Sequence, residues 1–142
     1  MDQSNRRQAR EQAFALLFEL SFHPGESLRD ILAARDEDDD TPAPDGFALE
    51  LALCVEENLQ DLDKQIEARL KNWKLSRISR ASHTILRLAV CEMRCFDDIP
   101  VGASINEAVE LAKIYADDEA PKFINGVLGA IARSEDNAEP GD

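Results

Sequence analysis

The sequence predicts an all-α fold of six or seven helices packed around one or two small bundles. Three observations support this prediction. Apolar residues recur at spacings of three and four along most of the chain, helix start and stop signals separate these stretches, and no stretch alternates like a β-strand. At 142 residues the chain has room for one domain of ordinary size, and its longest unbroken apolar run, 13–18, is too short to cross a bilayer.

The first helix is expected from about Ser4 to Ser21. Its apolar residues fall three and four positions apart, at Ala9, Ala13, Leu16, Leu17 and Leu20. The His-Pro-Gly sequence at 23–25 ends it, and Ser27 then precedes a short second helix with the sequence LRDILAAR. The acid- and proline-rich run at 36–45 is expected to be a solvated linker.

A long helical pattern runs from Asp45 to Leu70, either as one helix or as two with a break near Asn58. The next helix is expected from about Ser79 and ends before Pro100. Its apolar stripe comprises Ile85, Leu88, Ala89, Met93 and Phe96.

The C-terminal part of the chain predicts two more helices. Ser104 and Glu107 have the spacing of a capping box and are expected to open the helix INEAVELAKIYA. The last helix is expected to start near Asp117 or Asp118, to tolerate Pro121 in its first turn and to run to about Arg133. Residues 1–133 are thus interpreted as one domain, and the acidic segment 134–142 as a disordered tail.

The charge of the chain is unevenly distributed. The formal net charge is −13, which argues against binding of nucleic acid. However, the segments 24–45 and 134–142 carry net charges of −6 and −4, whereas residues 62–94 contain eight basic and three acidic residues. A local basic surface can therefore coexist with the acidic total.

Signals for catalysis or metal binding are weak. The chain has no glycine-rich phosphate loop, no nucleophile elbow and no pair of metal-spaced histidines, and His83 is more simply a structural histidine than a general base. The three cysteines, Cys54, Cys91 and Cys95, include no CxxC pair, which favours reduced thiols over a disulfide framework or a zinc site. We therefore expect no enzyme activity, no cofactor and no metal. No secretory signal is recognised, so a cytoplasmic location is expected.

The first helix carries the most informative group of side chains. A rotation of about 100° per residue places Arg7, Arg10, Phe14 and Phe18 along a flank beside the apolar stripe. Arginines next to aromatic rings suit single-stranded RNA, because they meet phosphates and stack on bases. The alternative is that the two rings pack against a neighbouring helix while the arginines are solvated, and the residues alone favour this alternative.

Three segments resemble the NusB transcription antitermination factors. They are RRQAREQAFALLFEL at 6–20, ILRLAVCEM at 85–93 and IPVGASINEAVELAKIYADDEAPKFINGVLGAIAR at 99–133. The resemblance implies an all-helical fold of two small packed subdomains and a role without catalysis. It implies binding of the boxA element in leader transcripts of ribosomal RNA together with the ribosomal protein NusE, which makes RNA polymerase resistant to termination.

The resemblance also assigns residues to two surfaces. The implied RNA contacts are Arg6, Arg7, Arg10, Phe18, Lys122, Phe123 and Asn125. The implied surface for the protein partner comprises Ser82, His83 and Arg87. For Phe123 and Asn125, packing within the last helix is an equally good interpretation, and Gly126 and Gly129 are expected to permit close helix approach.

The sequence also departs from the family pattern. Gln8 replaces a common third arginine and Phe18 replaces a common tyrosine, so one phosphate contact and one hydroxyl are missing. Two alternative functions remain at this point. One is a protein adaptor or homodimer with the basic helix occluded, as some family members self-associate. The other is the RNA-binding domain of an RNA-modifying enzyme, since a similar domain is fused to a methyltransferase in some ribosomal RNA cytosine methylases.

Overall fold

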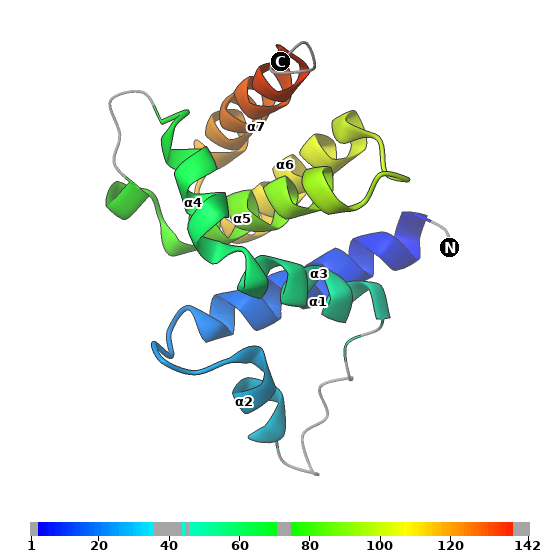
Figure 1. Cartoon of the computed structure of the whole chain (residues 1–142), viewed down its shortest axis with the longest axis vertical. Coiled ribbons are helices and arrows are strands. Elements are labelled where there is room, and N and C mark those ends of the chain that lie inside the picture. The colour runs from blue at the N-terminus through cyan, green and yellow to red at the C-terminus, as the bar shows by residue number, and fades with distance from the viewer. Residues whose placement is uncertain (1–2, 36–43, 45, 71–74, 138–142) are drawn as a thin grey trace.

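The computed structural model describes residues 3–35, 44, 46–70 and 75–137, and all seven α-helices in these residues are shown in Figure 1. Their bounds are α1 Gln3–Leu20, α2 Leu28–Ala33, α3 Gly46–Glu57, α4 Leu59–Glu67, α5 Arg80–Cys95, α6 Val101–Tyr115 and α7 Ala120–Asn137. A short 3-10 helix, η1, spans Leu75–Arg77. The described residues contain no β-strand, so the predicted all-α class is confirmed.

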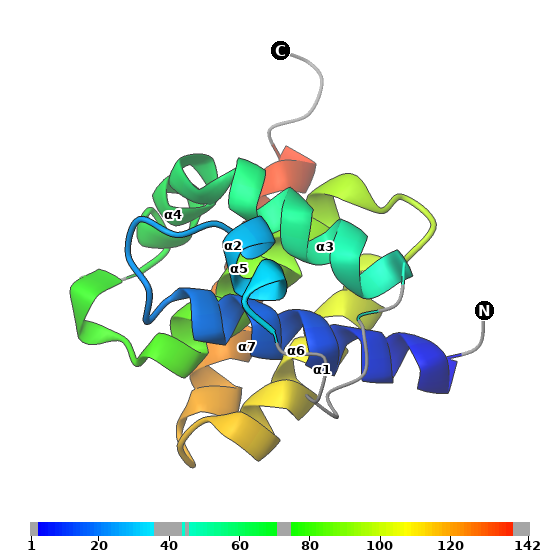
Figure 2. The ribbon, with the colours of Figure 1, turned by 90° about the horizontal axis from the view of Figure 1, so that it is seen from below.

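Helix α5 is the centre of the fold. It contacts α1, α3, α4, α6 and α7, whereas α2 contacts only α1 and α3 among the substantial contacts of the described helices. Figures 1 and 2 show α1, α2 and α3 gathered on one side of α5, with α6 and α7 paired on the other. This central position explains why α5 is buried around most of its circumference, from Ser82 to Glu92.

Short-range signals account for most helix boundaries. Ser27 caps α2 by accepting a hydrogen bond from the Asp30 amide, and Ser79 caps α5 by accepting one from the Ser82 amide. The long pattern from 45 to 70 forms two helices that meet at Asn58, whose side-chain amide donates to the Cys54 carbonyl at 2.7 Å. Of the two predicted alternatives, the structure therefore has two helices with a break near Asn58.

The structure corrects two boundaries near the C-terminus. Helix α6 begins at Val101 with Pro100 as its N-cap, so Ser104 lies inside the helix and does not cap it. Helix α7 starts after Asp117, as predicted, but continues beyond Arg133 to Asn137. The predicted linker at 36–45 lies outside the described residues except for position 44, and the predicted tail is outside them beyond 137.

The structure also corrects the prediction of three reduced thiols. Cys54 of α3 and Cys91 of α5 form a disulfide, and Cys95 is free and exposed one helical turn further along α5. The bond joins two helices that already pack together in the core. Of the helices that the structure describes, none is long and apolar enough to span a membrane.

Candidate nucleic-acid interface

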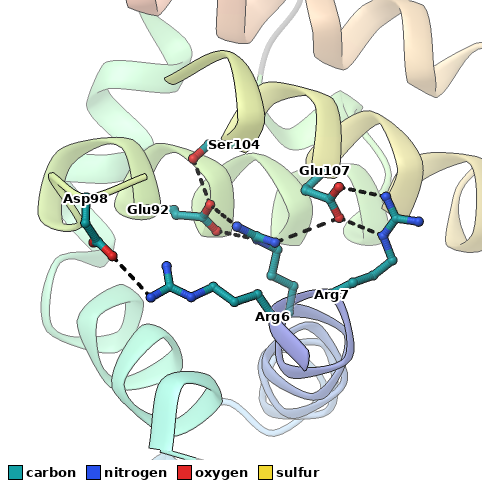
Figure 3. Close-up of polar contacts among 7 residues, drawn as sticks. Arg6, Arg7, Glu92, Asp98, Ser104 and Glu107 are labelled. Carbon is teal, nitrogen blue, oxygen red and sulfur yellow. Dashed lines mark hydrogen bonds and ion pairs between the residues drawn. The ribbon is translucent and has the colours of Figure 1, made fainter. Parts of the chain in front are cut away.

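The three arginines at the start of α1 have three different environments (Figure 3). Successive helix positions differ by about 100° in direction, so Arg6 and Arg7 reach different acidic partners. Arg10 pairs with Glu92 and also lies 3.8 Å from Glu107, the partner of Arg7. These partners come from α5, from the loop after it and from α6. The ion pairs thus tie α1 to the C-terminal half of the chain.

Arg10 is a core residue. Its side chain is 5% exposed, and its guanidinium donates two hydrogen bonds to Glu92 at 2.8 and 2.7 Å. Glu92, 1% exposed, also accepts a bond from the Ser104 hydroxyl at 2.7 Å. A phosphate has no access to a guanidinium buried and paired in this way. The structure therefore corrects the assignment of Arg10 to the RNA contacts and gives it the role of a helix-joining residue.

Arg7 lies at the surface beside this buried pair. Its side chain is 55% exposed and donates to both carboxylate oxygens of Glu107, at 2.9 and 2.8 Å. These hydrogen bonds from Arg7 hold the pKa of Glu107 below its ordinary value, and the same contact raises the pKa of Arg7. Glu107 is thus the partner of an arginine on another helix and not part of a capping box.

Arg6 is held from two sides. Its guanidinium lies 4.5 Å from the centre of the Phe47 ring and 3.2 Å from a carboxylate oxygen of Asp98. Asp98 remains largely exposed, so this ion pair faces solvent. The expectation that the arginines of α1 are simply solvated is therefore wrong, because all three have acidic partners.

Four aromatic side chains form a row of contacting rings along α1. Tyr115 stacks on Phe14 at 4.7 Å between ring centres, Phe14 stacks on Phe18 at 5.4 Å, and Phe22 meets Phe18 edge-on at 5.1 Å. Phe14 is buried and Phe18 is partly buried, so the favoured packing interpretation is the observed one. The two ends of the aromatic row remain open, since Tyr115 is 44% and Phe22 54% exposed.

Arg80 closes the far end of the aromatic row. Its guanidinium lies 4.3 Å from the centre of the Phe22 ring and donates to the Ser21 carbonyl at 2.6 Å. An exposed arginine stacked on an exposed ring has the chemistry to contact both a phosphate and a base. Sequence reasoning missed this pair. The available signal was the spacing of four that links Phe14, Phe18 and Phe22 beyond the predicted helix stop.

A surface hollow lies close by, between the N-terminal ends of α5 and α7. Its wall includes Arg77, Ser79, Ser82, Asp117, Lys122 and Phe123. Lys122 is exposed and Phe123 is partly buried against the core. Asp117 caps α7 by accepting hydrogen bonds from the amides of Glu119 and Ala120, as expected for an acid at a helix start. The structure thus brings two of the predicted RNA contacts to one concave surface.

The predicted RNA contacts fall into two groups at opposite ends of α6. Arg6 and Arg7 pair with acids just before and within the first half of α6, whereas Lys122 and Phe123 follow its last turn. A helix of 15 residues spans about 20 Å. Figure 2 likewise shows the start of α1 far from the first turn of α7. The remaining predicted contact on α7, Asn125, has an exposed side chain.

The predicted partner surface is only partly exposed. Asp63 of α4 accepts two hydrogen bonds from Arg87, at 2.9 and 2.7 Å, and lies 2.7 Å from Nε2 of His83. Burial would raise the pKa of Asp63, but the hydrogen bonds from Arg87 and His83 outweigh it and hold the pKa well below its ordinary value. Ser82 is 4% exposed, so it is a core residue that only borders the hollow.

Among the described residues, one group of side chains has the chemistry to hold a metal ion. The sulfur atoms of Cys54, Cys91 and Cys95 lie within 4.8 Å of one another. Two of these sulfurs are bonded as a disulfide, which removes them as thiolate ligands. Cys54 and Cys95 line a different hollow from the one that Lys122 lines.

Comparison with known proteins identifies relatives along nearly the whole chain. A model of the NusB family matches residues 7–133. The transcription antitermination protein NusB of Bacillus pumilus is 46% identical over 126 residues, covering 89% of this chain and 93% of the relative. The protein of the same name from Clostridium novyi is 41% identical over 133 residues, covering 92% and 99%.

Solved structures agree with these relatives. T. maritima NusB superposes with a TM-score of 0.80 at 37% identity, covering 92% of both chains. A structure of the antitermination factors NusB and NusE in complex with double-stranded RNA matches with a TM-score of 0.80 at 28% identity, covering 94% of this chain and all of the other.

Proposed function

The chain belongs to the NusB family, and from this premise we propose that it binds boxA-like single-stranded RNA of ribosomal RNA leader transcripts together with the ribosomal protein NusE. Its relatives are named transcription antitermination proteins, and it acts as a factor of that kind, without catalysis. By preventing premature termination, the complex would let RNA polymerase complete its transcript. We place this activity in the cytoplasm.

The aromatic row and its flanking cations carry this proposal. Arg6 and Arg7 lie near the start of α1. Arg80 lies against Phe22 just beyond the other end of α1, and Lys122 lines the hollow that Ser79, next to Arg80, also lines. Exposed aromatic edges lie between them at Tyr115 and Phe22. Cations that contact phosphates and rings that stack on bases are the two elements of a surface for single-stranded RNA.

The path of the RNA follows from this arrangement. We place the phosphates against Arg6 and Arg7 at one end and against Arg80 and Lys122 at the other, with bases on Tyr115 and Phe22. Phosphate contacts position a strand without reading its sequence, whereas contacts to bases discriminate. Phe123 in the hollow and Asn125 on α7 are the proposed reading residues, since a ring can stack and an amide can both donate and accept.

Weak binding by the protein alone is part of the proposal. Each surface arginine of α1 already has an acidic partner, so a phosphate must compete with Glu107 or Asp98. The net charge of −13 adds long-range repulsion. NusE would supply the missing affinity by binding next to His83 and Arg87, which are held in place by Asp63.

A fluorescence anisotropy titration tests the proposal. Labelled boxA-like RNA, a scrambled strand and a duplex are titrated with the protein, with and without NusE. We expect NusE to tighten binding selectively for the boxA-like strand. Arg7→Ala should weaken binding to the boxA-like and scrambled strands by similar factors, whereas Phe123→Ala should reduce the preference for the boxA-like strand.

Two outcomes would reject the proposal. Absence of RNA binding under every condition would move the function to a protein adaptor, and light scattering would then test for a homodimer that hides α1. Stronger binding to the duplex than to the single strand would remove base stacking from the mechanism. A variant of the exposed Leu53 on α3, Leu53→Ala, serves as the control, because Leu53 lies on a helix without a proposed RNA contact.

A further inference from the structure

The three cysteines differ in their access to solvent. Cys95 is exposed at the last residue of α5, Cys54 on α3 is partly buried, and Cys91 is 1% exposed. The free Cys95 sulfur lies 3.0 Å from the sulfur of Cys54, which is bonded to Cys91. A reagent in solution therefore meets Cys95 first and the buried sulfur of Cys91 last.

From this gradient we infer that Cys95, Cys54 and Cys91 form a thiol–disulfide exchange site, in which Cys95 exchanges with small disulfides and thiols from solution and passes the change inward. The inference is independent of the proposed RNA binding. It needs no movement between helices, since all three sulfurs already lie within 4.8 Å of one another. Exchange proceeds by attack of a thiolate on a disulfide sulfur, which requires this kind of contact.

Oxidation of the reduced protein takes three balanced steps. The Cys95 thiolate attacks a disulfide RSSR, which forms a Cys95–SR bond and releases RS⁻, which takes up a proton. The Cys54 thiolate then attacks the Cys95 sulfur, forming a Cys54–Cys95 bond and releasing the second RSH. Finally the Cys91 thiolate attacks the Cys54 sulfur, which forms the Cys54–Cys91 bond and releases the Cys95 thiolate. The Cys95 thiolate takes up the proton that Cys91 has lost. Two protein thiols are oxidised and one RSSR is reduced to two RSH.

A surface hollow beside the cysteines selects the reagent. Cys54 and Cys95 both line it, whereas Cys91 does not. The other walls include the rings of Phe47 and Phe96 and the charged groups of Arg6, Glu50, Asp97 and Asp98. Three acids against one base give the hollow a negative character. A small neutral or cationic disulfide should therefore enter it more readily than an anionic one.

The test follows disulfide formation in the fully reduced, folded protein with cystamine as the cationic probe. Samples are quenched by alkylation, and mass spectrometry of peptides locates each bond. The parent should form the Cys54–Cys91 bond with only a transient adduct on Cys95. Cys95→Ser should form it at least about tenfold more slowly, because the entry thiol is missing. Cys91→Ala should stop at a Cys54–Cys95 bond.

Controls separate this mechanism from direct attack. In concentrated guanidinium chloride the protein unfolds and all three thiols are equally exposed. The rates of disulfide formation in Cys95→Ser and in the parent should then agree within about threefold. Glutathione disulfide, which is anionic, should react more slowly than cystamine with the folded parent. Circular dichroism verifies that each variant is folded. A Cys95→Ser rate equal to that of the folded parent, or a cystamine adduct on Cys54 in Cys91→Ala, would overturn the inference.

Discussion

Replacement of Arg10 by methionine should destabilise the protein while leaving its affinity for RNA intact. The substitution removes both hydrogen bonds to Glu92 and leaves that carboxylate buried, with Ser104 as its remaining donor. Loss of one partner of a buried ion pair costs about 3–5 kcal/mol. Against a total stability of about 5–15 kcal/mol, this loss is large. For a domain of this size it corresponds to a fall in melting temperature of roughly 10–17 °C.

Two measurements on the same variant decide the role of Arg10. Thermal and urea denaturation followed by circular dichroism give the stability, and anisotropy at a temperature where Arg10→Met is still folded gives the RNA affinity. Arg7→Met is the matched control, because Arg7 is exposed and pairs with Glu107, a carboxylate that also lies 3.8 Å from Arg10. It should show the opposite pattern, with little loss of stability and clearly weaker RNA binding.

A compensating variant tests the cause of the destabilisation. Arg10→Met combined with Glu92→Leu and Ser104→Ala replaces Arg10 and its hydrogen-bonded partners Glu92 and Ser104 by apolar side chains, which often restores stability. It should recover most of the loss seen in Arg10→Met alone. The reasoning would be refuted by an Arg10→Met protein of parental stability that has lost RNA affinity more than tenfold, since that result would place Arg10 at the RNA.

Further predictions concern the surface and its electrostatics. If Arg6, Arg7, Arg80 and Lys122 contact phosphates, the log–log dependence of RNA affinity on salt should have a slope near −2.8, so a fourfold rise in salt weakens binding about fifty-fold; a flat salt titration would contradict this set. Phe22→Ala should weaken RNA binding about tenfold through lost stacking, with Leu53→Ala unchanged in the same anisotropy assay. Because the pKa of Asp63 is lowered in the folded state, its contribution to stability is complete above the ordinary value of 3.8 and is lost as the pH falls below it. The stability difference between the parent and Asp63→Asn, measured by urea denaturation, should therefore shrink between pH 7 and pH 3.

Local signals were sufficient for most of the fold. The helices at 28–33 and 80–95 follow serine caps, and their apolar residues face the core as the spacing predicts. The capping box predicted at Ser104 and Glu107 does not form, because both side chains bind residues of other helices instead. Ser104 donates to Glu92 and Glu107 accepts from Arg7, and a sequence window contains neither partner.

The candidate site was harder to predict for the same reason. The family resemblance assigns the arginines at the start of the first helix to RNA as a group, although Arg10 lies in register with the buried residues Ala13, Phe14 and Leu17. Glu92 lies in the same register with Leu88 and Ala89 on α5. An arginine in the apolar stripe of one helix and a glutamate in the apolar stripe of another are the sequence features that indicate a buried ion pair. The disulfide between α3 and α5 had no such signal, since it depends on how two helices pack.

The ion pairs of α1 join residues that are distant in the chain. Arg10, Arg6 and Arg7 are separated from Glu92, Asp98 and Glu107 by 82, 92 and 100 positions. During synthesis at about 5–20 residues per second, the first helix therefore waits roughly 5–20 s for its acidic partners. Throughout that interval the nascent chain carries unneutralised arginines, and loop closure over long separations slows their burial further. The ionic state of the first helix is thus set by residues 92–107, which are translated long after the helix itself.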